Sequence, residues 1–96
     1  MVKSDAPVPF EHIVSTEFDQ GEGVLVDLNS KQYFQLNATA MLVWECLEKH
    51  KSLPEIVNQI TDAYDVSSER AAESLEAILK DFQARGLVQS VTGNGR

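Results

Sequence analysis

The sequence has little that could tie it together covalently or hold it in a membrane. Cys46 is the only cysteine among 96 residues, so an internal disulfide cannot form. No apolar run approaches the roughly 18 residues that suggest a membrane span. The N-terminal stretch MVKSDAPVPF lacks the uninterrupted apolar segment of a signal peptide. These absences predict a reducing, cytoplasmic protein that does not bind a membrane.

Basic charge is also scarce. Eight Lys and Arg residues stand against 15 Asp and Glu residues, which gives a formal net charge of −7 and a pI near 4.6. This balance disfavours binding to phosphate backbones and anionic lipid surfaces, and it favours basic or neutral partners. A chain of this length builds one modest core, in which a roomy catalytic cleft is hard to fit. We therefore expect one small domain that is not an enzyme and does not bind nucleic acid.

Residues that usually carry chemistry are few and scattered. His12 and His50 are far apart and lack Cys or acidic neighbours at the spacing of metal ligands, so we expect ordinary surface histidines. Cys46 lies in the middle of a predicted helix, next to its apolar stripe, which favours a small buried hydrophobe over a nucleophile. Trp44 lies on that stripe, where packing in the core is the expected role. The sequence predicts no catalytic residue, no metal site and no cofactor.

What the sequence does contain begins with three predicted strands. HIVSTEF at 12–18 is the first, and GVLVDL at 23–28 alternates in the way typical of a half-buried strand. Residues 29–31 form a turn, and residues 32–36 form the third strand. The second strand places Val24, Val26 and Leu28 on one face and Leu25 and Asp27 on the other. The third places Phe34 and Leu36 on one face and Tyr33 and Gln35 on the other.

Three helices are expected after the strands. Asn37 can cap the first helix, and Ser52-Leu53-Pro54-Glu55 has the pattern of a capping box with proline in the first turn. Ser67 begins the third helix, and Gly86 ends it as a left-handed cap. Leu87 and Val88 are expected to pack back on the core. The apolar stripes are Ala40, Val43, Trp44 and Leu47 in the first helix; Ile56, Val57, Ile60, Ala63 and Tyr64 in the second; and Leu75, Ile78, Leu79 and Phe82 in the third.

The element order predicts an α+β fold. Three antiparallel strands precede three helices, and the last two helices resemble a helix-turn-helix pair, which gives a winged-helix-like arrangement. Residues 1–10, with two prolines and no apolar periodicity, are predicted to be a flexible arm. Residues 11–90 form the domain, and residues 91–96 form a flexible tail.

A winged-helix-like fold raises the possibility of a DNA-binding regulator, but the third predicted helix lacks the charge for it. Between residues 67 and 85 it has three basic and four acidic residues, a net charge of −1. Since phosphate neutralisation supplies most non-specific DNA affinity, the main attractive term is missing. The third strand instead offers a sheet edge that can take an extended peptide as an added strand. A DNA-binding regulator and a homodimer that pairs through this edge remain the alternatives.

Most of the chain resembles the PqqD family. The similarity runs from Gly23 to Val88 and rests on several short pieces in order. These are YFQLN at 33–37, Trp44 seven residues after Asn37, EIV at 55–57 ahead of AYDV at 63–66, and RGLV at 85–88. The family comprises small proteins of pyrroloquinoline quinone biosynthesis and of related peptide-modification pathways.

The resemblance implies a non-catalytic peptide chaperone. Such a domain binds the leader of a ribosomally made precursor and presents the precursor to a modifying enzyme, often a radical S-adenosylmethionine enzyme. In the family the leader adds to the third strand and lies against the third helix. The family often has an acidic residue where this chain has Ser74. Carried onto this sequence, the expected peptide-binding residues are Gln32, Tyr33, Phe34, Gln35, Leu36, Ala71, Ser74, Leu75 and Ile78.

Overall fold

The computed structural model describes residues 6–89, and these residues form two small sheets and three helices. The strands are β1 (Val8–Pro9), β2 (Ile13–Glu17), β3 (Gly23–Asp27), β4 (Gln32–Leu36) and β5 (Val88–Gln89). The helices are α1 (Ala38–Glu48), α2 (Leu53–Ala63) and α3 (Ser68–Ala84). Strands β2, β3 and β4 form an antiparallel sheet in that order, and β1 pairs with β5. The predicted α+β fold, with three strands ahead of three helices, is confirmed.

The segment before β2 differs from the prediction of a flexible arm over residues 1–10. Strand β1 pairs antiparallel with β5, with Pro9 opposite Val88. The Phe10 N–H then donates to the Leu87 carbonyl at 3.1 Å. A two-residue strand that contains proline has no alternation from which to recognise it, which is why the sequence pattern missed it. Residues 1–5 of the predicted arm, and the predicted tail at 91–96, lie outside the described residues.

The three-stranded sheet has one buried face and one outer face. Leu25 is fully buried, and its partner Phe34 packs partly buried against the core. On the opposite face Val26 pairs with Tyr33, whose exposed fraction is 73%, and Leu28 is half exposed. The predicted half-buried strand is confirmed. The face of β3 with the larger number of apolar residues is nevertheless the outer one.

Side-chain caps set the helix starts as the sequence predicts. Asn37 Oδ1 accepts the Ala40 N–H at 2.9 Å and begins α1. Ser52 and Glu55 form the reciprocal capping box at the start of α2. Ser67 accepts an N–H of the first turn of α3, and Gly86 follows that helix with φ of +72°. These caps fix where α1 leaves β4 and where α3 ends, and both positions matter for the site.

Trp44 joins α1 to α3 at the centre of the core. It is fully buried, and its ring meets Phe82 edge to face with a centroid distance of 5.5 Å. Its Nε1 donates to Glu48 Oε2 at 3.0 Å, so the buried indole N–H has a partner. Cys46 is buried as expected, and burial raises the pKa of its thiol. The predicted core roles of both residues are confirmed.

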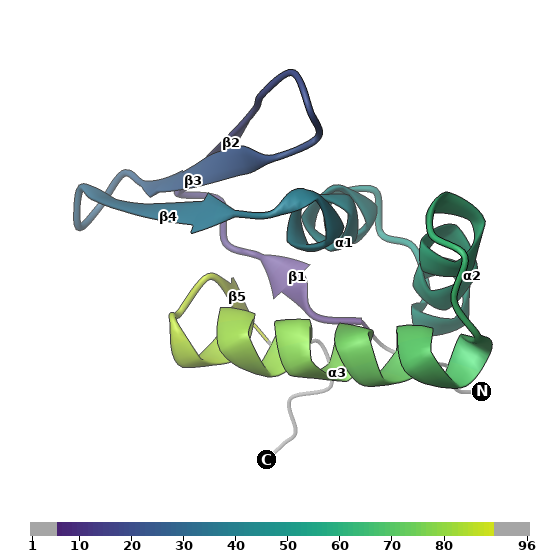
Figure 1. Ribbon diagram of the computed structural model, residues 1–96. Helices are drawn as coiled ribbons and strands as arrows, with labels where there is room; N and C mark the ends of the chain where they lie inside the picture. The colour runs from purple at the N-terminus through teal and green to yellow at the C-terminus, as the bar shows by residue number, and fades with distance from the viewer. Residues whose placement is uncertain (1–5, 90–96) are drawn as a thin grey trace, which may run out of the picture.

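The edge strand β4 of the three-stranded sheet lies close to α3. Figure 1 shows the three-stranded sheet above and α3 below, with β4 as the strand on the side of α3. Helix α1 continues from β4 into the middle of the molecule, and α2 stands at the far end of α3. Leu87 and Val88 are buried, which confirms that the chain after α3 packs back on the core.

Candidate functional site

The hydrogen bonds of β3 alternate between its two neighbours. The Leu28 N–H donates to the His12 carbonyl at 2.9 Å, on the side of β2. In an antiparallel sheet each residue directs its N–H and C=O to the same side, and consecutive residues alternate. Residues 24, 26 and 28 therefore face β2, and residues 23, 25 and 27 face β4.

This alternation determines which residues of β4 face its open edge. Leu25 faces β4 and lies opposite Phe34, so the backbone groups of Phe34 belong to the internal ladder. Those of Tyr33 and Gln35 then point away from β3. Within residues 6–89 no strand pairs with β4 on that side. The edge therefore presents two N–H groups and two carbonyls to an incoming chain.

A hollow lies beside this edge, between β4 and α3. Its volume is about 250 Å³. Leu36 and Phe82 are buried at its base, and Ile78 is half buried. We call it the groove hollow, and its lining residues are Gln35, Leu36, Asn37, Ala40, Ala77, Ile78, Asp81 and Phe82.

The structure brings together only part of the predicted binding set. Gln35, Leu36 and Ile78 line the groove hollow. Ala71 and Leu75 are buried, with exposed fractions of 0% and 4%, so in this structure they present almost no surface to a peptide. The family resemblance placed them at the site, on the same side of the third helix as Ile78. In the structure these two side chains pack in the core.

The other predicted residues remain accessible. Gln32 and Tyr33 are exposed on β4, and Phe34 is half buried on the face towards the core. Ser74 is exposed on α3, but it does not line the groove hollow.

Sequence reasoning missed two groups of residues at the groove hollow. Ala77 and Asp81 lie beside Ile78 on the same side of α3, and the helical period would have suggested them once Ile78 was placed. Ala40 and Asn37 come from the start of α1. Only the path of the chain from β4 into α1 brings them to the same hollow.

An ion pair of one acidic and one basic side chain lies at the groove hollow. The Arg85 Nε donates to Asp81 at 3.0 Å, and the guanidinium lies over the Phe34 ring at 5.6 Å from the centroid. Both charged side chains are about half exposed, so the ion pair itself adds only about 0 to 1 kcal/mol. The contact covers one side of Phe34 and keeps one cation beside the groove of an acidic protein.

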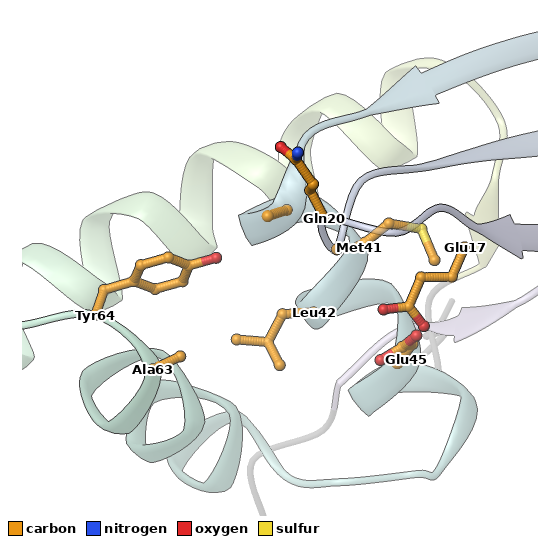
Figure 2. A pocket seen from close by; sticks show the side chains of 9 residues that line it. Glu17, Gln20, Met41, Leu42, Glu45, Ala63 and Tyr64 are labelled. Atoms are coloured by element: carbon orange, nitrogen blue, oxygen red, sulfur yellow. The ribbon is translucent and has the colours of Figure 1, made fainter.

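A second cavity lies away from this groove. Its volume is about 240 Å³, and it is bounded by the β2–β3 turn, α1 and the end of α2. Figure 2 shows the carboxylates of Glu17 and Glu45 side by side at one end and the Tyr64 ring at the other. The pKa of Glu45 is raised, first by burial and then by a hydrogen bond with Glu17 and by its negative charge. Two carboxylates that repel each other when both are ionised therefore line this cavity. None of its lining residues belongs to β4.

His12 contacts an aromatic ring and lies near a carboxylate. His12 stacks on Phe10 with a centroid distance of 5.3 Å, and its Nε2 lies 3.7 Å from Asp27 Oδ1. Across the described part of the chain, no group of three His, Cys, Asp or Glu residues could hold a metal ion. No helix between residues 6 and 89 is both long and apolar enough to cross a membrane.

Comparison with known proteins agrees with the fold and identifies a family. The family model for coenzyme PQQ synthesis protein D matches residues 22–88. The solved structure of TbiB1 in complex with the TbiA(beta) leader peptide is similar at a TM-score of 0.78 and 28% identity, and the match covers 93% of this chain and 99% of that one. Lasso peptide synthetase B1, complexed with the leader peptide, matches at a TM-score of 0.74 and 24% identity over 90% of this chain and 98% of that one, which shows the fold. No curated protein sequence matches the chain.

Proposed function

The chain belongs to the PqqD family, and on this basis we propose that it binds the leader of a ribosomally synthesised precursor peptide and presents the precursor to a modifying enzyme. The related TbiB1, at 28% identity, is described in complex with a leader peptide. The protein would act as a peptide adaptor and leave catalysis to its partner. Ribosomal precursors are made in the cytoplasm, so we place it there.

One observation carries this proposal: the open edge of β4 lies beside a hollow that has both apolar and polar lining residues. The backbones of Tyr33 and Gln35 face that edge, and Leu36 and Ile78 lie in the groove hollow next to it. A sheet edge gives a peptide hydrogen bonds that do not depend on its sequence, whereas a hollow selects among side chains. A recognition protein needs both.

The energetics show why the hollow is needed. Two edge residues offer four backbone hydrogen bonds, which contribute about 2 to 6 kcal/mol in total at 0.5 to 1.5 kcal/mol each. Ordering a flexible leader costs several kcal/mol and consumes much of this gain. Affinity must therefore come from apolar side chains of the leader. A leader side chain opposite Leu36 points towards the groove hollow, because directly paired residues share a face.

The partner enzyme and the product are the finer parts of the proposal. We propose a radical S-adenosylmethionine enzyme as the partner, in the synthesis of pyrroloquinoline quinone or of another modified peptide. Family membership supports both statements.

A titration with a candidate leader peptide tests the proposal. Amide NMR signals should move in Tyr33, Gln35 and Ile78, without added metal or cofactor. Ala77→Arg should fill the groove hollow and weaken binding by about tenfold or more. Ala72→Arg is the matched control, because Ala72 is exposed on the same helix, does not line the hollow, and changes the charge equally. Equal affinity of both variants would remove the groove hollow from the site.

The two alternatives predict different results in the same experiments. A DNA-binding regulator should give a gel shift at low salt that disappears at high salt, but α3 with its caps has three basic and four acidic residues. A homodimer that pairs through β4 should show a molecular mass that depends on concentration and falls when the leader is added. We expect neither behaviour.

A further inference from the structure

Another hollow, distinct from the groove hollow and from the cavity lined by Glu17 and Glu45, lies on the outer face of the three-stranded sheet. Its volume is about 440 Å³, and we call it the outer hollow; it is lined by Phe18, Val24, Tyr33 and Gln35. Phe18 is 46% exposed and Tyr33 is 73% exposed. None of the four side chains is charged, although 24% of the residues of the chain are. Large apolar side chains gathered on an open surface often mark a contact with a ligand or partner.

The outer hollow and the groove hollow share one lining residue, Gln35. The same residue also lines a third depression, together with Glu22, Leu36 and Asn37. The depressions thus follow the last residues of β4 from one face of the sheet to the other. The backbone of Gln35 points to the open edge between them.

Strand geometry connects these hollows to a docked peptide. A peptide residue opposite Leu36 points its side chain into the groove hollow, and the adjacent residue, opposite Gln35, points to the outer face. The edge is about 4.8 Å from the added strand, and Val24 is one strand further away. A long or aromatic side chain is needed to cover Gln35 and reach Val24.

A second copy of the chain fits this outer face poorly. Three strands of five residues span roughly 16 by 10 Å, an area of roughly 160 Å². This is far less than the roughly 800 Å² that each partner buries in a standard stable interface. Because Gln35, whose backbone faces the open β4 edge, also lines the outer hollow, the peptide itself is the favoured occupant.

We propose that the leader is recognised on both faces of its strand, with one apolar side chain in the groove hollow and a large apolar side chain in the outer hollow. The inference rests on the proposed function and defines the class of leader. The two anchor residues occupy adjacent positions, or positions three apart, because only an odd spacing puts side chains on opposite faces. A leader read by the groove alone would show apolar residues at even spacing.

Peptide display tests this without knowledge of the natural leader. A random library of about twelve-residue peptides is selected on the immobilised protein, with Gln35→Pro protein as the counter-selection. We expect enriched peptides to carry a large apolar pair at odd spacing. The double variant Phe18→Thr/Val24→Thr should bind such peptides about tenfold more weakly. Val14→Thr is the matched control, because Val14 is exposed on the outer face but does not line the hollow.

Each result decides a specific point. Odd-spaced pairs that lose affinity only with Phe18→Thr/Val24→Thr support recognition on both faces. Enrichment of even-spaced pairs, with unchanged affinity in that variant, overturns the inference and leaves the groove and the proposed function intact. Failure to enrich any peptide over the Gln35→Pro protein overturns the proposed function and the inference together. Circular dichroism establishes that each variant is folded, and Val24→Thr alone replaces the double variant if that one is not.

Discussion

Proline substitution at adjacent positions of β4 should have opposite consequences for folding and for binding. Phe34 directs its N–H to β3, whereas Gln35 directs its N–H to the open edge. Proline removes this donor and is tolerated in sheets mainly at open edges. Phe34→Pro should therefore unfold or severely weaken the domain. Gln35→Pro should remain folded and lose leader binding.

The hydrogen bonds on the two sides of β4 set the size of each effect. Phe34→Pro leaves a carbonyl of the fully buried Leu25 without its donor, at a cost of about 1 to 3 kcal/mol, and the misfit of the ring adds to this. A domain of 96 residues has a total stability of about 5 to 14 kcal/mol, so the loss is a large part of it. Gln35→Pro loses no internal bond, and its backbone misfit costs about 1 kcal/mol. Leader binding then weakens by about 1 to 2 kcal/mol or more, roughly tenfold or greater.

Thermal unfolding by circular dichroism and fluorescence anisotropy with a labelled leader measure the two effects. Phe34→Ala and Gln35→Ala separate the loss of each side chain from the loss of its N–H. If Phe34→Pro stayed folded while Gln35→Pro unfolded, the assignment of the edge would be reversed. If both proline variants were folded and bound the leader normally, β4 would not be the docking edge.

Three further changes test other parts of the structure. His50 follows α1 with φ of +61°, a left-handed conformation that favours glycine. His50→Gly should therefore raise the free energy of unfolding by about 0.5 kcal/mol in denaturant titration. A decrease would contradict this interpretation. A Cβ on Gly23 would lie 2.6 Å from the Thr16 carbonyl oxygen. Gly23→Ala should therefore lower the free energy of unfolding by about 2 kcal/mol or more in the same assay. An unchanged midpoint would show that β2 and β3 can separate there. Because the pKa of Glu45 is higher in the folded state than in the unfolded state, the folded protein holds more protons between these two values, and stability falls as pH rises through the folded-state pKa. Glu17→Gln should therefore raise the melting temperature at pH 7 more than at pH 4, and an equal rise at both values would exclude carboxylate repulsion as the cause.

Most elements of the fold could be predicted from the sequence, because their signals are local. Asn37 and Ser52 each cap a helix by accepting an N–H three residues later in the chain. Gly86, in a left-handed conformation, follows α3. Alternation located β3 and β4 to within a residue. Family resemblance pointed to β4 and α3, which both contribute residues to the groove hollow. What the local pattern could not supply was β1, which is defined only by its pairing with β5 at the other end of the chain.

Packing between distant segments sets which face and which edge of each element is available. Ala71 and Leu75 share a helical stripe with Ile78, but packing buries the first two and leaves Ile78 at the groove hollow. The sequence could not assign the parity of β4, because every strand residue has the same backbone groups. Their direction follows from the register with β3, fixed by the Leu28 hydrogen bond to β2. Pairing between strands is a long-range choice, and it is what leaves the backbone of Gln35 at the open edge of the sheet.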